Sequence, residues 1–350
     1  MKKYLELYRK IKEKILSGEY QYGKRLESKR TMADKMGISV ITVEKAYSML
    51  LDEGYLYARE RSGYYVSDLS GLTLPTITEK AMPPMLPEER EERGEDFEYS
   101  VYIKTLRKVV SEKRESLFVK TSGAGCAALR NAISEYLFRY RGMYAPPQRI
   151  VIGSGSEQHY ETVVKLLGRG KLFGIEDPCY SQIEAVYSGM GVRTKKMTMT
   201  SEGIASELLT DDVDVLHVTP FHSYPSGVTA SVGKRAEYLE WAKRSGGYVI
   251  EDDFDSEFFL PGQPIETLYS MDKRDSVIYV NTFSKSLSPA MRIGYMILPQ
   301  ELMERYEKSF GVYTCTVPAL DQYVLAEFIS SGSFERHLNR KRRKMRKQIQ

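Results

Sequence analysis

Residues 277–295 read VIYVNTFSKSLSPAMRIGY. The run 277–280 consists of β-branched and aromatic residues, which predicts a buried strand. The polar residues that follow, with a lysine at 285 and an arginine at 292, predict a loop at the carboxyl end of that strand. In open α/β sheets, ligands bind in the crevice outside these ends. Lys285 is therefore a candidate amine nucleophile, and Arg292 a candidate clamp for an anion such as phosphate.

Three further segments join a predicted strand to a polar loop. Residues 150–158, IVIGSGSEQ, enter a Gly/Ser turn and then a helix, and backbone N–H groups at such a helix start bind phosphate. Residues 176–180, EDPCY, place Tyr180 where its ring offers a flat face. Residues 248–254, YVIEDDF, end in acids, one of which can pair with a protonated ring nitrogen.

A metal site is the rival interpretation of these acids. No histidine lies near them in the sequence, and we expect no metal.

From residue 97 onward, helical stretches alternate with short apolar runs. This alternation predicts an α/β domain around a mixed, mostly parallel sheet. The four polar loops follow predicted strands in chain order and supply a phosphate cradle, an aromatic face, a carboxylate and an amine. These are the four parts needed to hold pyridoxal 5′-phosphate. The predicted strands are 149–152, 172–175, 213–218, 248–250 and 277–280.

The first 67 residues predict a separate module. Helix 3–17 is amphipathic, Ser28 can cap a helix over 29–36, and Ser39 can cap a third helix that ends at Gly54. The short turn between the last two helices predicts a helix-turn-helix. Two short strands, 55–59 and 64–67, then predict a hairpin or wing.

A helix-turn-helix places the first residues of its second helix in the DNA major groove. Ser39 and Thr42 are therefore candidate base contacts, and basic residues around them are candidate phosphate contacts. The alternative is a small helical interaction module with a solvated charged surface. The DNA-binding candidates are Ser28, Lys29, Arg30, Ser39, Thr42, Arg59, Arg61 and Gly63.

Composition and charge divide the 350 residues in the same way. Apolar residues are 42% and charged residues 28%, a soluble globular balance, without an apolar run that could span a membrane. Three well-separated cysteines and the lack of a secretory signal indicate a reducing, cytoplasmic location. We expect a DNA-binding domain over 1–68, an acidic, Pro-rich linker over 69–96, and an α/β body over 97–350.

The module over residues 1–67 resembles the GntR family of winged helix-turn-helix repressors. Residues 97–335 resemble the fold type I aminotransferase superfamily. The fusion resembles MocR-type regulators, which join these two domains. The matching stretches include SKRTMA (28–33), GIS (37–39), EGYL (53–56), SGYYV (62–66), TPFHSYPSG (219–227) and GSFERH (332–337).

The resemblance implies roles for eight residues of the body. Lys285 would form a Schiff base with pyridoxal 5′-phosphate, and Asp252 would keep the pyridine nitrogen protonated. Tyr180 would stack on the ring. The phosphate would be held by Gly155, Ser156, Thr282, Ser284 and Arg292.

The chain departs from the family pattern at several positions. Val40 replaces an arginine at the start of the third helix, Phe254 replaces a tyrosine, and Tyr224 replaces the asparagine that enzymes carry. We expect the chain to lack most of the C-terminal small domain. Residues 336–350, which carry eight basic residues and no acidic one, would begin that domain as a helix.

The sequence thus favours a dimeric, DNA-binding transcriptional regulator that holds pyridoxal 5′-phosphate and senses an amine, an amino acid or the cofactor itself. Two alternatives remain open. One is a working aminotransferase with a non-essential head, against which Phe254 and Tyr224 count. The other is a repressor whose body holds no cofactor.

Overall fold

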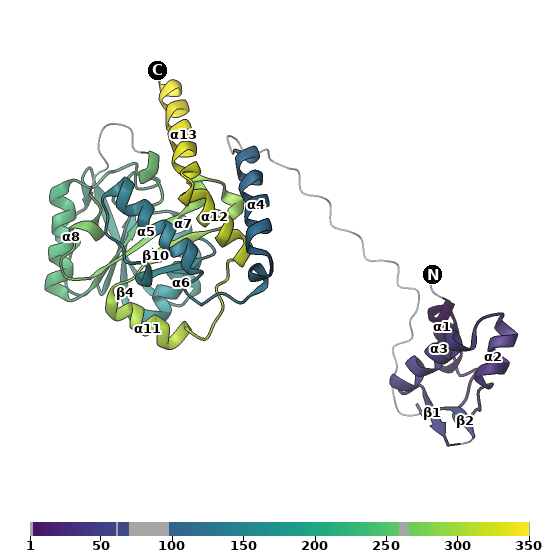
Figure 1. Ribbon diagram of the computed structural model, residues 1–350. Coiled ribbons are helices and arrows are strands. Elements are labelled where there is room, and N and C mark those ends of the chain that lie inside the picture. The colour runs from purple at the N-terminus through teal and green to yellow at the C-terminus, as the bar shows by residue number, and fades with distance from the viewer. Residues whose placement is uncertain (1–2, 61, 70–97, 259–265, 350) are drawn as a thin grey trace. The chain divides into compact units, whose positions relative to one another are not determined.

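The structure is a computed structural model that describes residues 3–60, 62–69, 98–258 and 266–349. The chain divides into two compact units, Met1–Glu91 and Glu92–Gln350, here called the head and the body (Figure 1). Except for Leu69, the predicted linker 69–96 lies outside the described residues, and so does the predicted DNA contact Arg61. No helix of the described residues is both long and apolar enough to cross a bilayer.

The head contains the three helices and the hairpin expected from its sequence. Ser28 and Ser39 cap α2 and α3, because each hydroxyl accepts the backbone N–H three residues on. Gly37 ends α2 with φ of +62°, a left-handed conformation that glycine adopts without strain. The elements are α1 (Lys3–Leu16), α2 (Lys29–Met36), α3 (Val40–Asp52), β1 (Leu56–Arg59) and β2 (Gly63–Val66).

A small core holds the head together. Tyr47 of α3 is fully buried, donates a hydrogen bond of 3.0 Å to the carbonyl of Glu27, and meets Tyr64 of the hairpin edge-to-face. Leu7 and Ile11 of α1 are buried in the same cluster. Each helix therefore buries one apolar face, as the spacing in the sequence predicts.

The body is built on an eight-stranded sheet with the order β3-β10-β9-β8-β7-β4-β5-β6. Neighbouring strands from β9 to β5 pair in parallel, whereas β10 is antiparallel to both β3 and β9. The strands are β3 (Ile150–Gly153), β4 (Leu172–Asp177), β5 (Arg193–Thr200), β6 (Gly203–Ile204), β7 (Val215–Val218), β8 (Tyr248–Asp252), β9 (Val277–Thr282) and β10 (Gly294–Ile297). The expected mixed, mostly parallel sheet is confirmed.

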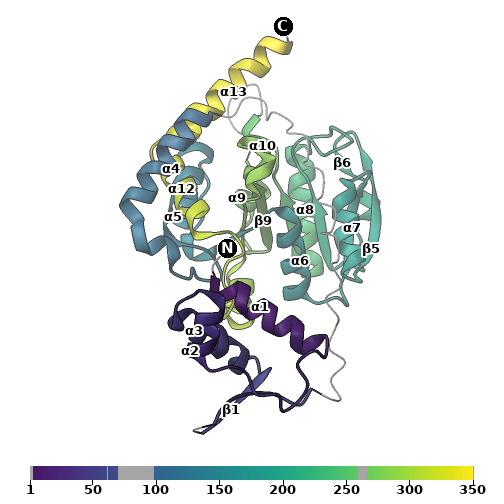
Figure 2. The same ribbon diagram turned by 90° about the vertical axis from the view of Figure 1, so that its right-hand side faces the viewer.

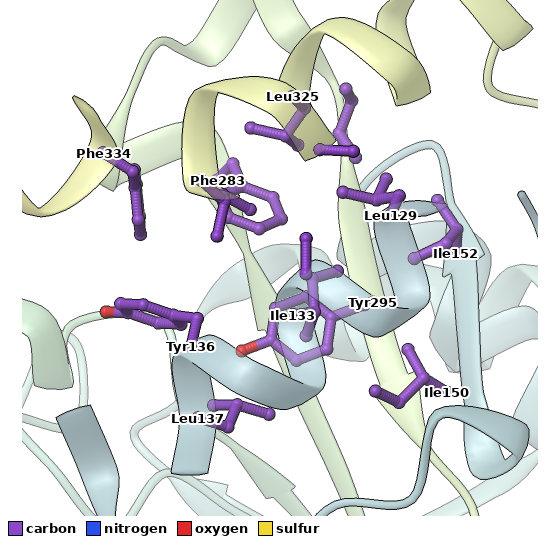
Figure 3. Packing of buried hydrophobic residues seen from close by; sticks show 14 of the residues in the cluster. Leu129, Ile133, Tyr136, Leu137, Ile150, Ile152, Phe283, Tyr295, Leu325 and Phe334 are labelled. Atoms are coloured by element: carbon purple, nitrogen blue, oxygen red, sulfur yellow. The ribbon is translucent and has the colours of Figure 1, made fainter. Parts of the chain in front are cut away.

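Helices cover both faces of this sheet, so its central strands are apolar on both sides. Ile278 and Val280 of β9 pack with α6, α7 and α11, whereas Tyr279 between them packs with α5 and α12. Figure 3 shows part of the cluster that contains α5 and α12, with Leu129, Ile133 and Leu325 labelled. The helices are α4 (Tyr99–Lys113), α5 (Ala127–Arg141), α6 (Ser156–Leu167), α7 (Ser181–Gly189), α8 (Val232–Ser245), α9 (Leu268–Met271), α10 (Phe283–Ser286), α11 (Gln300–Phe310), α12 (Ala319–Ser330) and α13 (Ser333–Ile349).

The basic segment near the end of the chain forms helix α13, as expected. Its first turns pack on the body through Phe334 and Leu338, which are buried. Its later turns extend beyond the rest of the body (Figure 2).

Candidate functional site

A pocket of about 390 Å³ opens at the edge of the sheet where β4, β7, β8 and β9 end. Antiparallel β10 begins at the same edge, which brings Arg292 to it. Seven of the eight predicted body residues line the pocket, and Gly155, the eighth, directly precedes Ser156 in the chain. The lining residues are Ser156, Glu157, Tyr160, Tyr180, Gln182, Ile183, Thr219, Tyr224, Asp252, Phe254, Thr282, Ser284, Lys285 and Arg292.

Asp252, the last residue of β8, places a buried carboxylate at the pocket wall. Its side chain is 7% exposed. The Tyr160 hydroxyl donates to Oδ2, and Nε2 of His217 lies 3.8 Å from the same oxygen. Oδ1 has no hydrogen-bond partner among the described residues. A buried carboxylate oxygen without a donor is costly, so this atom is suited to accept a hydrogen bond from a ligand.

The strand alternates its side chains, so the acids that flank Asp252 face the other way. Glu251 accepts hydrogen bonds of 2.8 Å from the backbone N–H groups of Leu268 and Tyr269. Burial raises the pKa of Glu251 to about 8. Asp253 forms an ion pair of 3.0 Å with Arg141. Both flanking acids are therefore bound into the fold, which leaves Asp252 as the acid that faces the pocket.

Lys285 lies in the short helix α10 with its side chain partly exposed. Its ammonium is 2.7 Å from Oδ1 of Asp255 and 5.1 Å from the ring centre of Phe254. The backbone around it is held by α13: Lys341 donates to the Lys285 carbonyl at 2.6 Å, and His337 lies 3.0 Å from the Ser286 carbonyl. The lysine thus lines the pocket on an anchored turn, with Asp255 as its partner.

The part of the pocket formed by Gly155, the first turn of α6 and Arg292 can receive an anion. Gly155, with φ of +93°, precedes the first turn of α6, and no described side chain caps this helix. A Cβ at Gly155 would lie 2.5 Å from Nη2 of Arg292, so only glycine lets the guanidinium come this close. Nη2 of Arg292 is 2.6 Å from Oε2 of Glu157. Helix N–H groups and a guanidinium together suit a phosphate.

Aromatic side chains form a third part of the pocket. Tyr180 follows β4 and is 38% exposed, and its ring meets that of Tyr224 edge-to-face at 6.0 Å. One face of Tyr180 can therefore stack on a planar ligand.

Beneath the Tyr224 loop, the carboxyl group of Glu176 accepts hydrogen bonds from the Thr219 N–H at 3.0 Å and from the Ser223 hydroxyl at 2.5 Å. Burial raises the pKa of Glu176 to about 7.

Sequence reasoning missed several residues of this site. Tyr160 is one helical turn after Ser156, and that spacing was the available signal for a second pocket residue on α6. Glu157 lies in the predicted segment 150–158, but the sequence gives no sign that its carboxylate pairs with Arg292. The Lys285–Asp255 pair had no signal in the sequence, because it depends on the path of the loop after β8.

The head places its predicted DNA contacts around the first turns of α2 and α3. Ser28 and Ser39 are helix caps, and the Ser39 hydroxyl lies 2.8 Å from that of Thr42. Lys29 pairs with Glu44 of α3. Arg30 is exposed.

In the wing, Arg59 packs over the rings of Tyr57 and Tyr65. Gly63 begins β2 with φ of +116°. Val40 and Ile41, at the start of α3, are 41% and 76% exposed, so this helix presents apolar groups to solvent.

Comparisons with known proteins agree with this division. Residues 97–350 match the family described as aminotransferase class I and II, and residues 3–66 match the bacterial regulatory proteins of the gntR family. The uncharacterized HTH-type transcriptional regulator YdeL of Bacillus subtilis (strain 168) is 33% identical over 98% of this chain and 77% of its own length. The probable rhizopine catabolism regulatory protein MocR of Rhizobium meliloti is 28% identical over 97% of this chain and 74% of its own length.

Among solved structures, an archaeal alanine:glyoxylate aminotransferase aligns with a TM-score of 0.64 at 24% identity. The aligned region covers 69% of this chain and 62% of that one. The kynurenine aminotransferase of Pyrococcus horikoshii gives the same TM-score at 23% identity, over 71% of this chain and 64% of its own. These likenesses establish the fold of the body.

Proposed function

Because this chain belongs to the GntR-family transcriptional regulators that carry an aminotransferase class I and II domain, we propose that its body binds pyridoxal 5′-phosphate through Lys285 and senses an amine, an amino acid or the cofactor itself. The head would bind double-stranded DNA through α3 and the wing. The proposal for the body depends on whether the pocket residues fit the cofactor.

One observation carries the proposal: Oδ1 of buried Asp252, which has no hydrogen-bond partner in the described part of the chain, shares a pocket with Lys285 and Arg292. A protonated pyridine nitrogen is the donor that this oxygen lacks. The bend at Gly155, which a Cβ would fill, and the start of α6 suit the phosphate. The donor set therefore fits pyridoxal 5′-phosphate at both ends.

When bound, the cofactor supplies an aldehyde that condenses with a primary amine. Lys285 would provide that amine, and Oδ1 of Asp255 lies 2.7 Å from its nitrogen. Asp252 would keep the ring nitrogen protonated, and the hydroxyl of Tyr160 holds the Asp252 carboxylate in position. Tyr180 would stack on the ring, and Thr282, Ser284 and Arg292 would hold the phosphate together with the first turn of α6.

Two pocket residues favour sensing over turnover. Phe254 presents a ring without a hydroxyl, so it donates no hydrogen bond to a bound ring. Tyr224 is 60% exposed and contacts Tyr180, so it stands at the pocket entrance. The pocket thus contains the groups that would hold the cofactor, but residue 254 has no hydrogen-bond donor in its side chain.

Regulation requires that the effector change the state of the heads. An effector shifts an equilibrium only as far as it binds the two states unequally. We propose a homodimer in which effector binding to the bodies changes how the two heads engage paired DNA sites. Two linked heads would bind such sites with avidity.

The test is the visible absorbance of the purified full chain during titration with pyridoxal 5′-phosphate, for the wild type beside Lys285→Ala. In the wild type we expect an absorbance band at longer wavelength than that of the free cofactor. Borohydride should bleach this band, because it reduces the C=N bond to a C–N single bond, and the cofactor should then stay with the protein through gel filtration. The variant should show neither the band nor the retained cofactor. A wild type that retains no cofactor yet shifts upstream DNA in a mobility assay would refute the proposal for the body. Rapid turnover of an amino donor would refute the sensing role.

A further inference from the structure

Glu157 places a carboxylate inside the part of the pocket proposed to receive phosphate. Its Oε2 lies 2.6 Å from Nη2 of Arg292. A Cβ built at Gly155 would meet both groups, at 2.5 Å from Nη2 and 2.9 Å from Oε2. The glycine bend, the guanidinium and the carboxylate therefore share one small volume.

The carboxylate is held by the same features that would hold a phosphate. Glu157 is the second residue of α6, a helix of 12 residues, where the helix dipole favours negative charge. Arg292 supplies the only opposite charge that contacts it within the described residues. An anionic ligand that needs Arg292 and the start of α6 thus meets a negative charge already in place.

The field of Glu157 also reaches the aromatic wall. Burial, and after it the charge of Glu157, raise the pKa of the Tyr180 hydroxyl. Glu157 and Tyr180 thus line the same pocket.

The ion pair is not required by the fold. The side chains of Glu157 and Arg292 are 30% and 51% exposed, and ion pairs at such exposure add little stability. Removing the carboxylate should therefore change the binding of an anionic ligand while leaving the stability of the fold nearly unchanged.

We propose that Glu157 is an internal competitor for the phosphate of the cofactor, which lowers the affinity of the body for pyridoxal 5′-phosphate and keeps loading reversible. This inference rests on the proposed function. An incoming phosphate must either displace the carboxylate from Arg292 or bind beside a like charge, and both weaken binding. A site with weakened affinity changes its occupancy when the cofactor concentration changes, as a sensor of the cofactor requires.

The experiment compares the wild type, Glu157→Gln and a control, Glu161→Gln. Glu161 lies one turn further along α6 and pairs at 3.3 Å with Lys165, outside the pocket. Each full-length protein is titrated with pyridoxal 5′-phosphate and, separately, with pyridoxal, which has the aldehyde but no phosphate. We expect Glu157→Gln to lower the dissociation constant for pyridoxal 5′-phosphate by about tenfold or more, leaving that for pyridoxal unchanged. The control should match the wild type for both.

Equal affinity of Glu157→Gln and the wild type for pyridoxal 5′-phosphate would overturn the inference while leaving the proposed function standing. So would an equal gain for pyridoxal, because the effect would then not concern the phosphate. A second readout does not need Lys285 chemistry: inorganic phosphate should raise the unfolding temperature of Glu157→Gln more than that of the wild type. If neither the wild type nor either variant retains pyridoxal 5′-phosphate, the proposed function fails. The change in unfolding temperature with inorganic phosphate still decides whether Glu157 competes with anions for Arg292.

Discussion

Replacing Glu176 with glutamine should stabilise the body most above neutral pH and leave its stability nearly unchanged at and below about pH 4.5. Glu176 is 4% exposed, and its carboxyl group lies between the Thr219 N–H and the Ser223 hydroxyl. Burial outweighs these hydrogen bonds and raises the pKa from 4.5 to about 7. A glutamine has the same shape, accepts from the same N–H through its oxygen and donates to the Ser223 oxygen through its amide.

The size and sign follow from this difference in pKa. Below about pH 4, the carboxyl group is protonated in both the folded and the unfolded chain and costs nothing. Between the unfolded pKa of 4.5 and the folded pKa of about 7, only the unfolded chain releases the proton, so the folded state loses about 1.4 kcal/mol per pH unit. Above pH 7 the loss totals about 3.4 kcal/mol, and Glu176→Gln avoids it.

The assay is urea unfolding of the full chain, followed by tryptophan fluorescence at several values between pH 4.5 and 8.5. Trp241 is the only tryptophan of the sequence and is buried in α8, so the signal reports on the body alone. The other buried carboxyl groups are common to both proteins and cancel in the comparison. A difference in unfolding free energy that is the same at pH 5 and pH 8, or that favours the wild type at pH 8, would refute the reasoning.

Three further changes test the site and the head. Gly155→Ala should weaken pyridoxal 5′-phosphate binding at least about tenfold in the same titration, because its Cβ would lie 2.5 Å from Arg292 and its φ is +93°. Ser39→Ala should destabilise the head by about 1 kcal/mol because α3 loses its cap, and hydrogen exchange of the α3 backbone amides in the full chain measures this loss. Ile41 is exposed at the start of α3, so it can contact thymine methyl groups in the major groove. On DNA duplexes that the wild type selects from a random pool, Ile41→Ala should weaken binding by about fourfold for each thymine methyl that Ile41 contacts. Replacing those thymines with uracil should weaken binding by the wild type but not by the variant.

The sequence located five strands of the body correctly but placed the carboxyl ends of four of them too early, three of them by two residues. Asp177, Asp252 and Thr282 still pair with the neighbouring strands, although their polar side chains suggest a loop. A strand that ends at a ligand pocket keeps its backbone ladder while its last side chains turn polar. The polarity that marked the site thus also obscured where each strand ends.

Three strands had no clear signal in the sequence, and one of them, β6, is only two residues long. Residues 193–200 are mostly polar, and only Met197 is buried, because β5 lies near the edge of the sheet with much of its surface exposed. β10 is only four residues long and begins with a glycine, so it lacks the length on which periodicity depends. Its antiparallel direction cannot follow from alternation of helices and strands.

The choice of Asp252 among three consecutive acids shows what local pattern can and cannot supply. Strand alternation requires that Glu251 and Asp253 share one face and that Asp252 takes the other. Alternation alone leaves open which face carries the pocket. That is decided by α6, whose Tyr160 meets Asp252, and by Arg141 of α5, which meets Asp253 on the opposite face. Both partners lie more than ninety residues away in the chain.

Both cations of the pocket are paired with carboxylates of the chain itself. Lys285 lies 2.7 Å from Asp255, and Arg292 lies 2.6 Å from Glu157. A ligand that carries both an aldehyde and a phosphate must therefore displace two internal partners, each of which weakens its binding. A catalyst benefits from a cofactor that never leaves, whereas a sensor responds best when its dissociation constant lies near the ambient ligand concentration. The two ion pairs therefore favour reversible binding of the cofactor. Glu157→Gln removes one of the two pairs and leaves the Lys285–Asp255 pair in place.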